Sequence, residues 1–234
     1  MKQRSAGDLH VRFLGERSLA TYQEQILAIA EHLEIPYLVH FTRAENLESI
    51  INNGIYPVNR VKEVCENPTI NDTLRLDGRR EGTSISVAFP NCKMLYKYRR
   101  EKIGSEWVIL ILQPSVLWIK DCAFCKFNAA DIRIRNLPIE YLKTPQSFMD
   151  LFAELEGGTA RADLNLKSFD PTDVQAEVLV FDVIEPQLIE LVVFDSFATK
   201  ARYESAIGER KTCVYKENKG LFGERGYVRK YYYS

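Results

Sequence analysis

The chain has 234 residues, of which 46% are hydrophobic and 11% aromatic, with 31 Lys+Arg against 32 Asp+Glu. This composition predicts one sizeable globular domain or at most two small ones, and it excludes disordered, collagen-like and low-complexity classes. Because the formal net charge is −1, any binding of nucleic acid has to come from local basic patches.

No apolar run reaches the roughly 18 to 20 residues that a membrane helix needs, and the polar start, Met1 to Asp8, has no apolar signal-peptide core. Five scattered cysteines argue against a disulfide framework and fit a reducing compartment. We therefore expect a cytoplasmic protein. These cysteines are Cys65, Cys92, Cys122, Cys125 and Cys213.

Two of these cysteines, Cys122 and Cys125, have the C-x-x-C spacing of zinc sites. A tetrahedral site needs two further ligands, and neither a second C-x-x-C nor an H-x-x-x-H pattern is present. We expect buried thiols here and no metal.

The first elements follow from apolar spacing and from helix-ending residues. Residues 18–34 have the spacing of a helix that Pro36 ends, and residues 37–41 follow as a short strand. Thr42 and Glu45 have the spacing of a capping box for the next helix. Gly54 is the expected end of that helix.

The rest of the chain alternates irregular segments with apolar runs. Residues 57–82 are polar and rich in turn residues, which predicts a long loop or lid, and residues 159–174 predict a second irregular segment. Helices are expected over 91–98 and 144–156. Strands are expected over 84–89, 107–112, 176–182 and 188–194.

The order of these elements predicts the class and the domain organisation. No repeat and no interdomain linker is visible, so we expect one α+β domain over residues 1–234. Residues 1–35 would form a helical N-terminal extension of this domain.

Charge is distributed unevenly along the chain. Residues 71–102 hold eight basic and four acidic side chains. Residues 131–199 hold five basic and thirteen acidic side chains, and residues 200–234 hold nine basic and four acidic ones. Tyrosines interleave with the basic side chains at 97–100 and at 229–233, which suits phosphate contact and base stacking. Solvated faces or a basic C-terminal strand are the alternative interpretation.

Polar groups stand beside both irregular segments. His40 ends a strand, and Gln175 and Glu177 project from the same face as they enter the apolar strand after 159–174. A buried carboxylate is costly without a partner, so Glu177 is either functional or an edge-strand carboxylate paired with an arginine. No G-x-S-x-G elbow and no phosphate-binding glycine loop is present.

Three segments, in this order, resemble the DarT family of DNA ADP-ribosyltransferase toxins. They are 40–54 (HFTRAENLESIINNG), 86–96 (SVAFPNCKMLY) and 175–178 (QAEV). The first segment alone is also typical of RNA phosphotransferases that use NAD. The combination is much more specific.

This resemblance implies an enzyme that splits NAD at the nicotinamide bond and attaches ADP-ribose to a base, thymine or guanine, of single-stranded DNA. Its fold would be an ADP-ribosyltransferase-like domain with a mixed, mostly antiparallel two-sheet core and flanking helices. Its partner would be DarG, a macrodomain antitoxin that removes the modification. NAD is the ADP-ribose donor, and no metal is expected.

The resemblance also implies roles for individual residues. Glu177 would be the catalytic glutamate, because a carboxylate stabilises the positive charge that develops on the ribose. Arg75 would engage the NAD phosphates and assist catalysis, with Arg79 or Arg80 as alternatives. The NAD-binding residues would be His40, Thr42, Asn46, Arg75 and Tyr96. The DNA-binding residues would be Lys93, Lys97, Arg99, Arg100 and Lys167.

Other activities fit part of the pattern. A transferase acting on protein or RNA would use the same NAD pocket, whereas the tyrosine-rich basic stretches favour nucleic acid. A 2′-phosphotransferase would need further arginine and histidine positions, and the chain has only three histidines. A non-catalytic binding module would keep Glu177 for structure alone.

Overall fold

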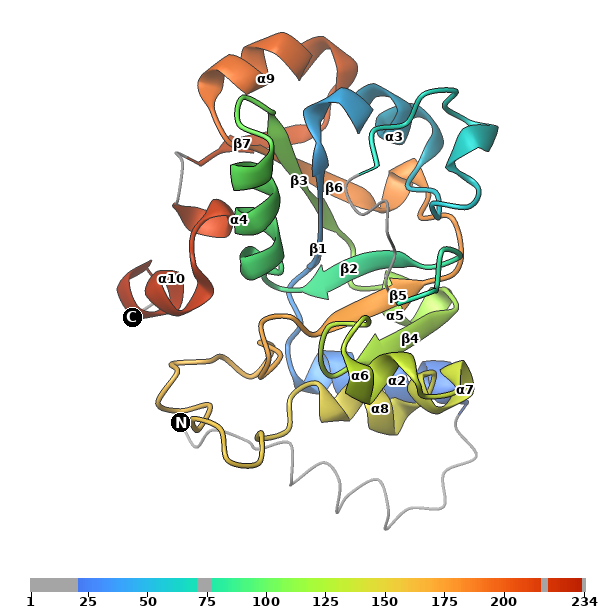
Figure 1. Cartoon of the computed structure of the whole chain (residues 1–234), viewed down its shortest axis with the longest axis vertical. Coiled ribbons are helices and arrows are strands. Elements are labelled where there is room, and N and C mark those ends of the chain that lie inside the picture. Colours follow the sequence, from blue (N-terminus) through green and yellow to red (C-terminus); the bar gives the residue numbers. More distant parts are fainter. Residues whose placement is uncertain (1–20, 71–76, 216–218, 233–234) are drawn as a thin grey trace.

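The structure is a computed structural model that describes residues 21–70, 77–215 and 219–232. Seven strands of this part form one mixed sheet in the order β4-β5-β2-β1-β3-β6-β7 (Figure 1). The strands are β1 (Leu38–Arg43), β2 (Thr83–Val87), β3 (Trp107–Leu112), β4 (Cys122–Cys125), β5 (Glu177–Val180), β6 (Ile189–Phe194) and β7 (Lys211–Val214).

The expectation of a two-sheet core is wrong, because all seven strands belong to a single sheet. The mixed, mostly antiparallel character is correct: among the strands that the structure describes, only the β6–β7 pairing is parallel. The reason for the single sheet lies in β2. Its end pairs with β1 at two positions, Leu38 with Val87 and Val39 with Ser86, while its start pairs with β5.

This short junction divides the sheet into two parts of different direction. Figure 1 shows β2, β5 and β4 running across the direction of β1, β3 and β6. Beyond Val39, β1 pairs with β3 alone. The later residues of β1 and the early residues of β2 are therefore not paired with each other, and the two strands diverge.

Short helices surround the sheet (Figure 1). Helix α2 packs against α5 and α8, and its buried side chains Ile26, Ile29 and Ala30 belong to the main hydrophobic core. The helices are α2 (Tyr22–His32), α3 (Leu47–Asn53), α4 (Cys92–Glu101), α5 (Val116–Ile119), α6 (Ile132–Arg135), α7 (Ile139–Leu142), α8 (Pro145–Asp150), α9 (Phe197–Tyr203) and α10 (Arg225–Tyr232).

Most expected elements are present with shifted ends. The helix expected at 18–34 begins at Tyr22, where Thr21 and Glu24 form a capping box. The helix expected at 144–156 ends early, at Asp150. Strands β4 and β7 were not expected, because four residues are too few to show an alternating pattern.

The predicted capping box of Thr42 and Glu45 is wrong. Strand β1 continues through Arg43, a 3-10 turn follows, and α3 begins only at Leu47. Gly54 does end α3: its φ is +94°, and an added Cβ would lie 2.4 Å from the carbonyl oxygen of Ile184. Only glycine fits this turn.

The C-x-x-C cysteines lie inside β4. Cys122 and Cys125 are three residues apart in a strand, so they face opposite sides and belong to different apolar clusters. Burial raises the pKa of both thiols. Within the described residues, no group of three His, Cys, Asp or Glu side chains could hold a metal ion, and no described helix is long and apolar enough to cross a membrane.

Candidate active site

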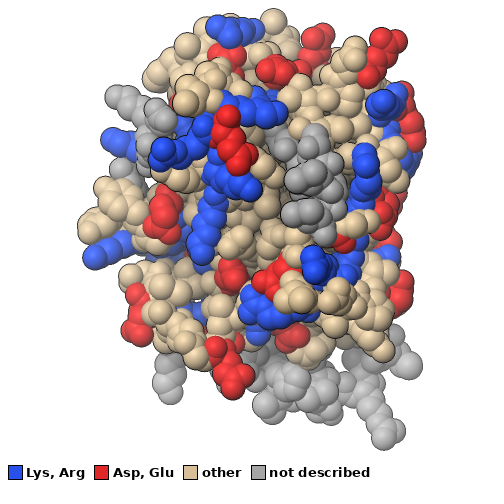
Figure 2. Space-filling view, in the orientation of Figure 1, with Lys and Arg blue, Asp and Glu red and all other residues tan. Residues whose placement is uncertain are grey.

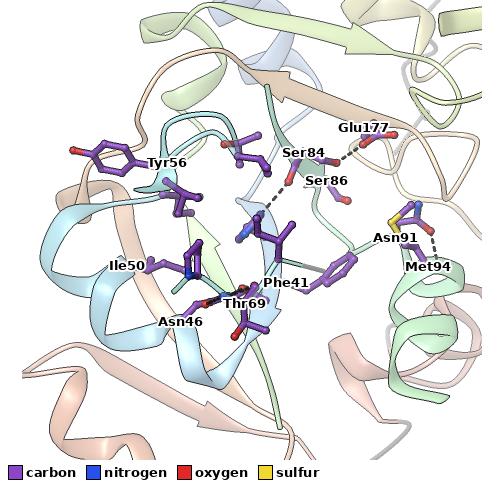
Figure 3. A pocket seen from close by; sticks show the side chains of 18 of the residues that line it. Phe41, Asn46, Ile50, Tyr56, Thr69, Ser84, Ser86, Asn91, Met94 and Glu177 are labelled. Atoms are coloured by element: carbon purple, nitrogen blue, oxygen red, sulfur yellow. Dashed lines mark hydrogen bonds between the residues drawn. The ribbon is translucent and has the colours of Figure 1, made fainter. Parts of the chain in front are cut away.

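A pocket opens where β1 and β2 diverge (Figure 3). One wall is apolar and comes from α3 and the segment 55–70. The opposite side is polar and comes from the strands, the start of α4 and residues 128–130. Its polar lining includes His40, Thr42, Asn46, Ser84, Ser86, Asn91 and Glu177. Its apolar wall includes Ile50, Ile55, Val58, Val61 and Val64.

Glu177, the first residue of β5, holds a buried carboxylate in this pocket. The side chain is 6% exposed. Its Oε2 accepts a hydrogen bond from the Ser84 hydroxyl (Figure 3), and its Oε1 accepts one from the backbone N–H of Ala129 at 2.5 Å. Two donors from separate segments therefore hold the carboxylate in place.

Ser84 of β2 also holds His40. Its Nδ1 lies 3.0 Å from the carbonyl oxygen of Ser84, and because a carbonyl only accepts, Nδ1 carries the proton. Burial lowers the pKa of His40. The ring is therefore neutral at pH 7, with Nε2 as an acceptor in the pocket.

Asn46 lies at the end of the pocket away from Glu177 (Figure 3). Its side-chain amide bonds both backbone groups of Thr69, donating to the carbonyl at 2.8 Å and accepting from the N–H at 3.0 Å. It also donates to Thr42 Oγ1 at 3.0 Å. Asn46 therefore fastens the segment 55–70 over the pocket, while Thr42 keeps Asn46 in place.

Helix α4 brings other residues to the pocket than the sequence indicates. Asn91 and Met94 line it, and the Asn91 side chain caps the helix by accepting from the Met94 N–H. Tyr96, expected to bind NAD, is 55% exposed outside the pocket, where its hydroxyl accepts a hydrogen bond from Arg100. Positions 94 and 96 face different sides of a helix.

The loop arginines have different positions. Arg75 lies outside the described residues. Arg79 is buried, and its guanidinium donates to the backbone carbonyl of Leu137 at 2.8 Å, which ties the loop to the region of α6 and α7. Arg80 is exposed, and neither of these two lines the pocket.

The residues expected to bind DNA lie mainly on α4. Figure 2 shows basic side chains gathered over this helix. Lys93, Lys97 and Arg100 are exposed, whereas Arg99 is partly buried with its guanidinium over the ring of Phe222. Lys167 lies on the irregular segment 159–174, outside the pocket lining.

The segment 159–174 is held by arginines. Asp170 is fully buried and forms a two-fold ion pair with Arg229 at 2.8 and 2.6 Å. Arg161 donates to the carbonyl oxygens of Lys167 and Asp170. The segment that leads into Glu177 therefore has an irregular backbone that hydrogen bonds and an ion pair hold in place.

Sequence reasoning missed several polar residues of the pocket, among them Ser84, Ser86 and Asn91. Ser84 and Ser86 alternate with the buried Ile85 and Val87, and this alternation in the expected strand was a signal for a polar face. Asn91 follows a proline at the start of a helix, which is a capping signal. The polar lining as a whole suits a substrate with a flat apolar part and a reacting centre that becomes positively charged beside Glu177.

Comparisons with known proteins agree with this geometry. A family model described as "ssDNA thymidine ADP-ribosyltransferase, DarT" matches residues 39–221. No curated protein matches the sequence.

The fold is similar to solved structures. One is Thermus sp. 2.9 DarT in complex with ADP-ribosylated ssDNA, with a TM-score of 0.57 and 14% identity over 78% of this chain and 95% of that chain. The same protein in complex with NAD+ has a TM-score of 0.52 and 17% identity over 78% of this chain and 96% of that chain. Thermosipho africanus DarTG in complex with ADP-ribose has a TM-score of 0.56 and 16% identity over 80% of this chain. This chain covers only 50% of the length of that one. At these identities the likeness shows the fold.

Proposed function

Because the chain belongs to the DarT family of single-stranded DNA thymidine ADP-ribosyltransferases, we propose that its pocket transfers ADP-ribose from NAD to thymine bases of single-stranded DNA. One observation carries the proposal: Glu177 is buried in the pocket and held by two donors. The pocket also gathers His40, Thr42 and Asn46, the residues that the family resemblance assigns to NAD.

NAD fits the two sides of this pocket. The nicotinamide and ribose need donors and acceptors, which the neutral His40 and the hydroxyls of Ser84 and Ser86 supply. The apolar wall of α3 and the segment 55–70 suits a flat ring. Thr42 and Asn46 support this wall through Thr69, so their role is to shape the site.

Catalysis follows from the placement of a negative charge. As the bond between the ribose C1′ and nicotinamide breaks, nicotinamide leaves with the electron pair and positive charge develops on the ribose. The Glu177 carboxylate stabilises this charge more than it stabilises the neutral ribose of the substrate. Because Ser84 and Ala129 hold it, little reorganisation is needed at the moment of reaction.

The same carboxylate serves the attacking base. In thymidine the ring N1 is bonded to the sugar, so N3 is the only ring nitrogen that carries a proton. N3 bonds to C1′ and loses that proton, which Glu177 accepts as a general base. Arg75 is our candidate for holding the diphosphate, since Arg79 is bound to backbone carbonyls elsewhere.

Single-stranded DNA is the expected form of the substrate. A base must leave the stack to reach a pocket, which costs a few kcal/mol in a duplex and little in a single strand. The exposed Lys93, Lys97 and Arg100 of α4 stand on the helix whose first turn lines the pocket. They would bind phosphates beside the target base, with Arg99 and Lys167 as further candidates.

The family also points to a partner and a compartment. A modification of DNA bases is toxic unless it is removed, and we propose that a DarG macrodomain antitoxin does so, as the family resemblance implies. NAD and DNA are both cytoplasmic, and so is the proposed site of action.

The test uses purified protein, NAD and a set of oligonucleotides that each lack one base, with the products weighed by mass spectrometry. The proposal predicts one added ADP-ribosyl group on every single strand that contains thymine, and none on the strand without it. Modification of an RNA strand or of the enzyme itself in place of DNA would contradict the proposal. Modification that follows guanine would refute the choice of base.

A further inference from the structure

The C-terminal helix α10 lies outside residues 39–221, which the family model matches. It is short, begins at Arg225 and has two unlike faces. One face is buried and made by Arg225, Val228 and Arg229, whereas the other is exposed and made by Tyr227, Lys230 and Tyr231. These two faces give the helix an anchor and an outward surface.

The buried face attaches α10 to both segments that lead into the active site. Arg225 donates to the carbonyl oxygens of Pro171 and Thr172 at 2.6 and 3.0 Å. The Arg229 guanidinium pairs with Asp170 and lies 5.4 Å from the centre of the Phe89 ring. Asp170 is seven residues before Glu177, and Phe89 is two residues before Asn91. Helix α10 is therefore fixed relative to the pocket.

The exposed face offers aromatic rings and a cation. Tyr227 and Tyr231 are 52% and 58% exposed, one helical turn apart, with ring centres 4.7 Å from each other. The Lys230 ammonium lies 5.2 Å from the centre of the Tyr231 ring. Exposed aromatic rings beside a positive charge suit the stacking of bases and the binding of their phosphates.

The surroundings of α10 suit a polyanion. Figure 1 shows α10 next to α4, and Val228 packs in the same apolar cluster as Leu95 of α4. The exposed acidic side chains of the stretches 92–102 and 219–231 are Glu101 and Glu224. Their exposed basic side chains are Lys93, Lys97, Arg100, Lys102, Lys219 and Lys230. The two helices together form a positively charged margin on a protein whose net charge is −1. A nucleic acid strand complements this margin better than an average protein surface does.

We propose that the exposed face of α10, made by Tyr227, Lys230 and Tyr231, is a docking platform for nucleotides that flank the target base. This platform rests on the proposed function and extends it. The strand runs from the pocket along α4, and a base that lies several nucleotides from the target, beyond the reach of a very short strand, stacks on the tyrosines. The buried arginine anchor holds the platform rigid, so docking of the flank places the target base at Glu177.

The test compares two lengths of a thymine-containing strand in a transfer assay with NAD. One has about 4 nucleotides and the other about 16, the range covered by common single-strand binding sites. Tyr227→Ala/Tyr231→Ala should raise the KM for the long strand about tenfold, the size of one lost stacking contact, with kcat and the reaction of the short strand unchanged. Tyr227→Phe/Tyr231→Phe keeps both rings and should restore the KM.

A matched control replaces an exposed tyrosine elsewhere, Tyr141→Ala on α7, which is 67% exposed, and it should leave the KM unchanged. An unchanged KM in the double-alanine variant would overturn the platform, as would an equal rise for the short strand. Loss of binding to the antitoxin with normal DNA kinetics would make α10 a protein interface and would also overturn it. If the wild-type protein modifies neither strand, the proposed function itself fails.

Discussion

Ser84 joins two titratable side chains of the pocket, His40 and Glu177, through different atoms. Its hydroxyl donates to Glu177, and its carbonyl accepts from His40. A single residue of β2 therefore sets the orientation of a carboxylate from β5 and of an imidazole from β1. Such bridging residues act on catalysis by fixing the groups that touch the substrate.

Ser84→Ala removes the hydroxyl and leaves the backbone bond to His40 in place. A hydrogen bond to a charged group contributes about 1.5 to 3 kcal/mol, so we expect the transfer rate to fall by roughly tenfold to a hundredfold. The Kd for NAD, measured by calorimetric titration, should change little. Ser84→Thr keeps the hydroxyl in a strand and should retain most of the rate. Equal rates in the alanine variant and the wild type would contradict this role.

His40 should make the stability of the protein depend on pH in a defined direction. Burial lowers the pKa of the folded His40 below its ordinary value of 6.5. Below about pH 6.5 the unfolded chain binds a proton that the folded protein does not, so the free energy of unfolding falls as the pH drops. The loss reaches at most about 1.4 kcal/mol per pH unit.

His40→Gln removes this titration, so its melting temperature should fall less than that of the wild type between about pH 7 and pH 5. At pH 7 the same variant should bind NAD more weakly, since it lacks the ring acceptor in the pocket. An identical pH dependence in both proteins would show that His40 is not buried in its neutral form.

At the residue scale, the sequence indicated the site where titratable side chains stand in apolar strands. A glutamate entering an apolar strand and a histidine within one are unusual, and both lie in the pocket. Tyr96 lies outside the pocket, because its motif gives spacing along the chain and not the face of the helix. Ser84 was missed because a serine in a strand has many ordinary roles.

At the scale of elements, the apolar runs predicted most strands and helices, but not the junction of the sheet. Two residue pairs join β1 to β2. The junction is this short because β2 turns from pairing with β5 to pairing with β1. That turn is a tertiary property without a local signal. The pocket exists because of it, since His40 and Thr42 lie beyond the last pair of the junction.

The anchoring of α10 gives a prediction about stability. Arg229 and Asp170 have side chains that are 2% and 0% exposed, and removing one partner of such a pair leaves a buried charge that costs about 3 to 5 kcal/mol. Arg229→Met should therefore lower the free energy of unfolding by that amount in urea titration. Arg229→Met/Asp170→Asn should recover part of it, because the unpaired charge is gone.

Arg60 and Glu63 provide a matched exposed pair, with side chains 43% and 52% exposed. Arg60→Met should change the free energy of unfolding by less than about 1 kcal/mol. Similar losses at both pairs would mean that α10 is not anchored through Arg229. The alternative interpretation of a basic C-terminal strand does not hold for residues 225–232, which form a helix, and two of its arginines, Arg225 and Arg229, are structural.

For the whole molecule, a net charge of −1 means that attraction to DNA comes from where charges lie. If Lys93, Lys97 and Arg100 bind phosphates, the affinity for a single strand should fall as the salt concentration rises. The slope of log K against log salt should be about −0.7 for each phosphate contact. Replacing all three with alanine should flatten the slope by up to about two units. NAD hydrolysis without DNA should not change.

The control for this prediction removes the same charge near α9 and β7, by alanine at Lys200, Arg202 and Lys211. This variant should keep the salt slope of the wild type, although its net charge is equally lowered. Equal slopes in all three proteins would remove α4 from the DNA-binding surface. The composition indicated this dependence on local patches, while only the fold shows which basic side chains are exposed.

The most direct test of the account is the rate at which Glu177→Gln transfers ADP-ribose from NAD to a thymine-containing single strand, measured by mass spectrometry beside the Kd for NAD. Glutamine keeps the size of the side chain and removes its charge. The account predicts a rate at least about a hundredfold lower, corresponding to roughly 3 kcal/mol or more of lost transition-state stabilisation, with NAD binding retained. A folded Glu177→Gln protein that modifies DNA at the wild-type rate would contradict it.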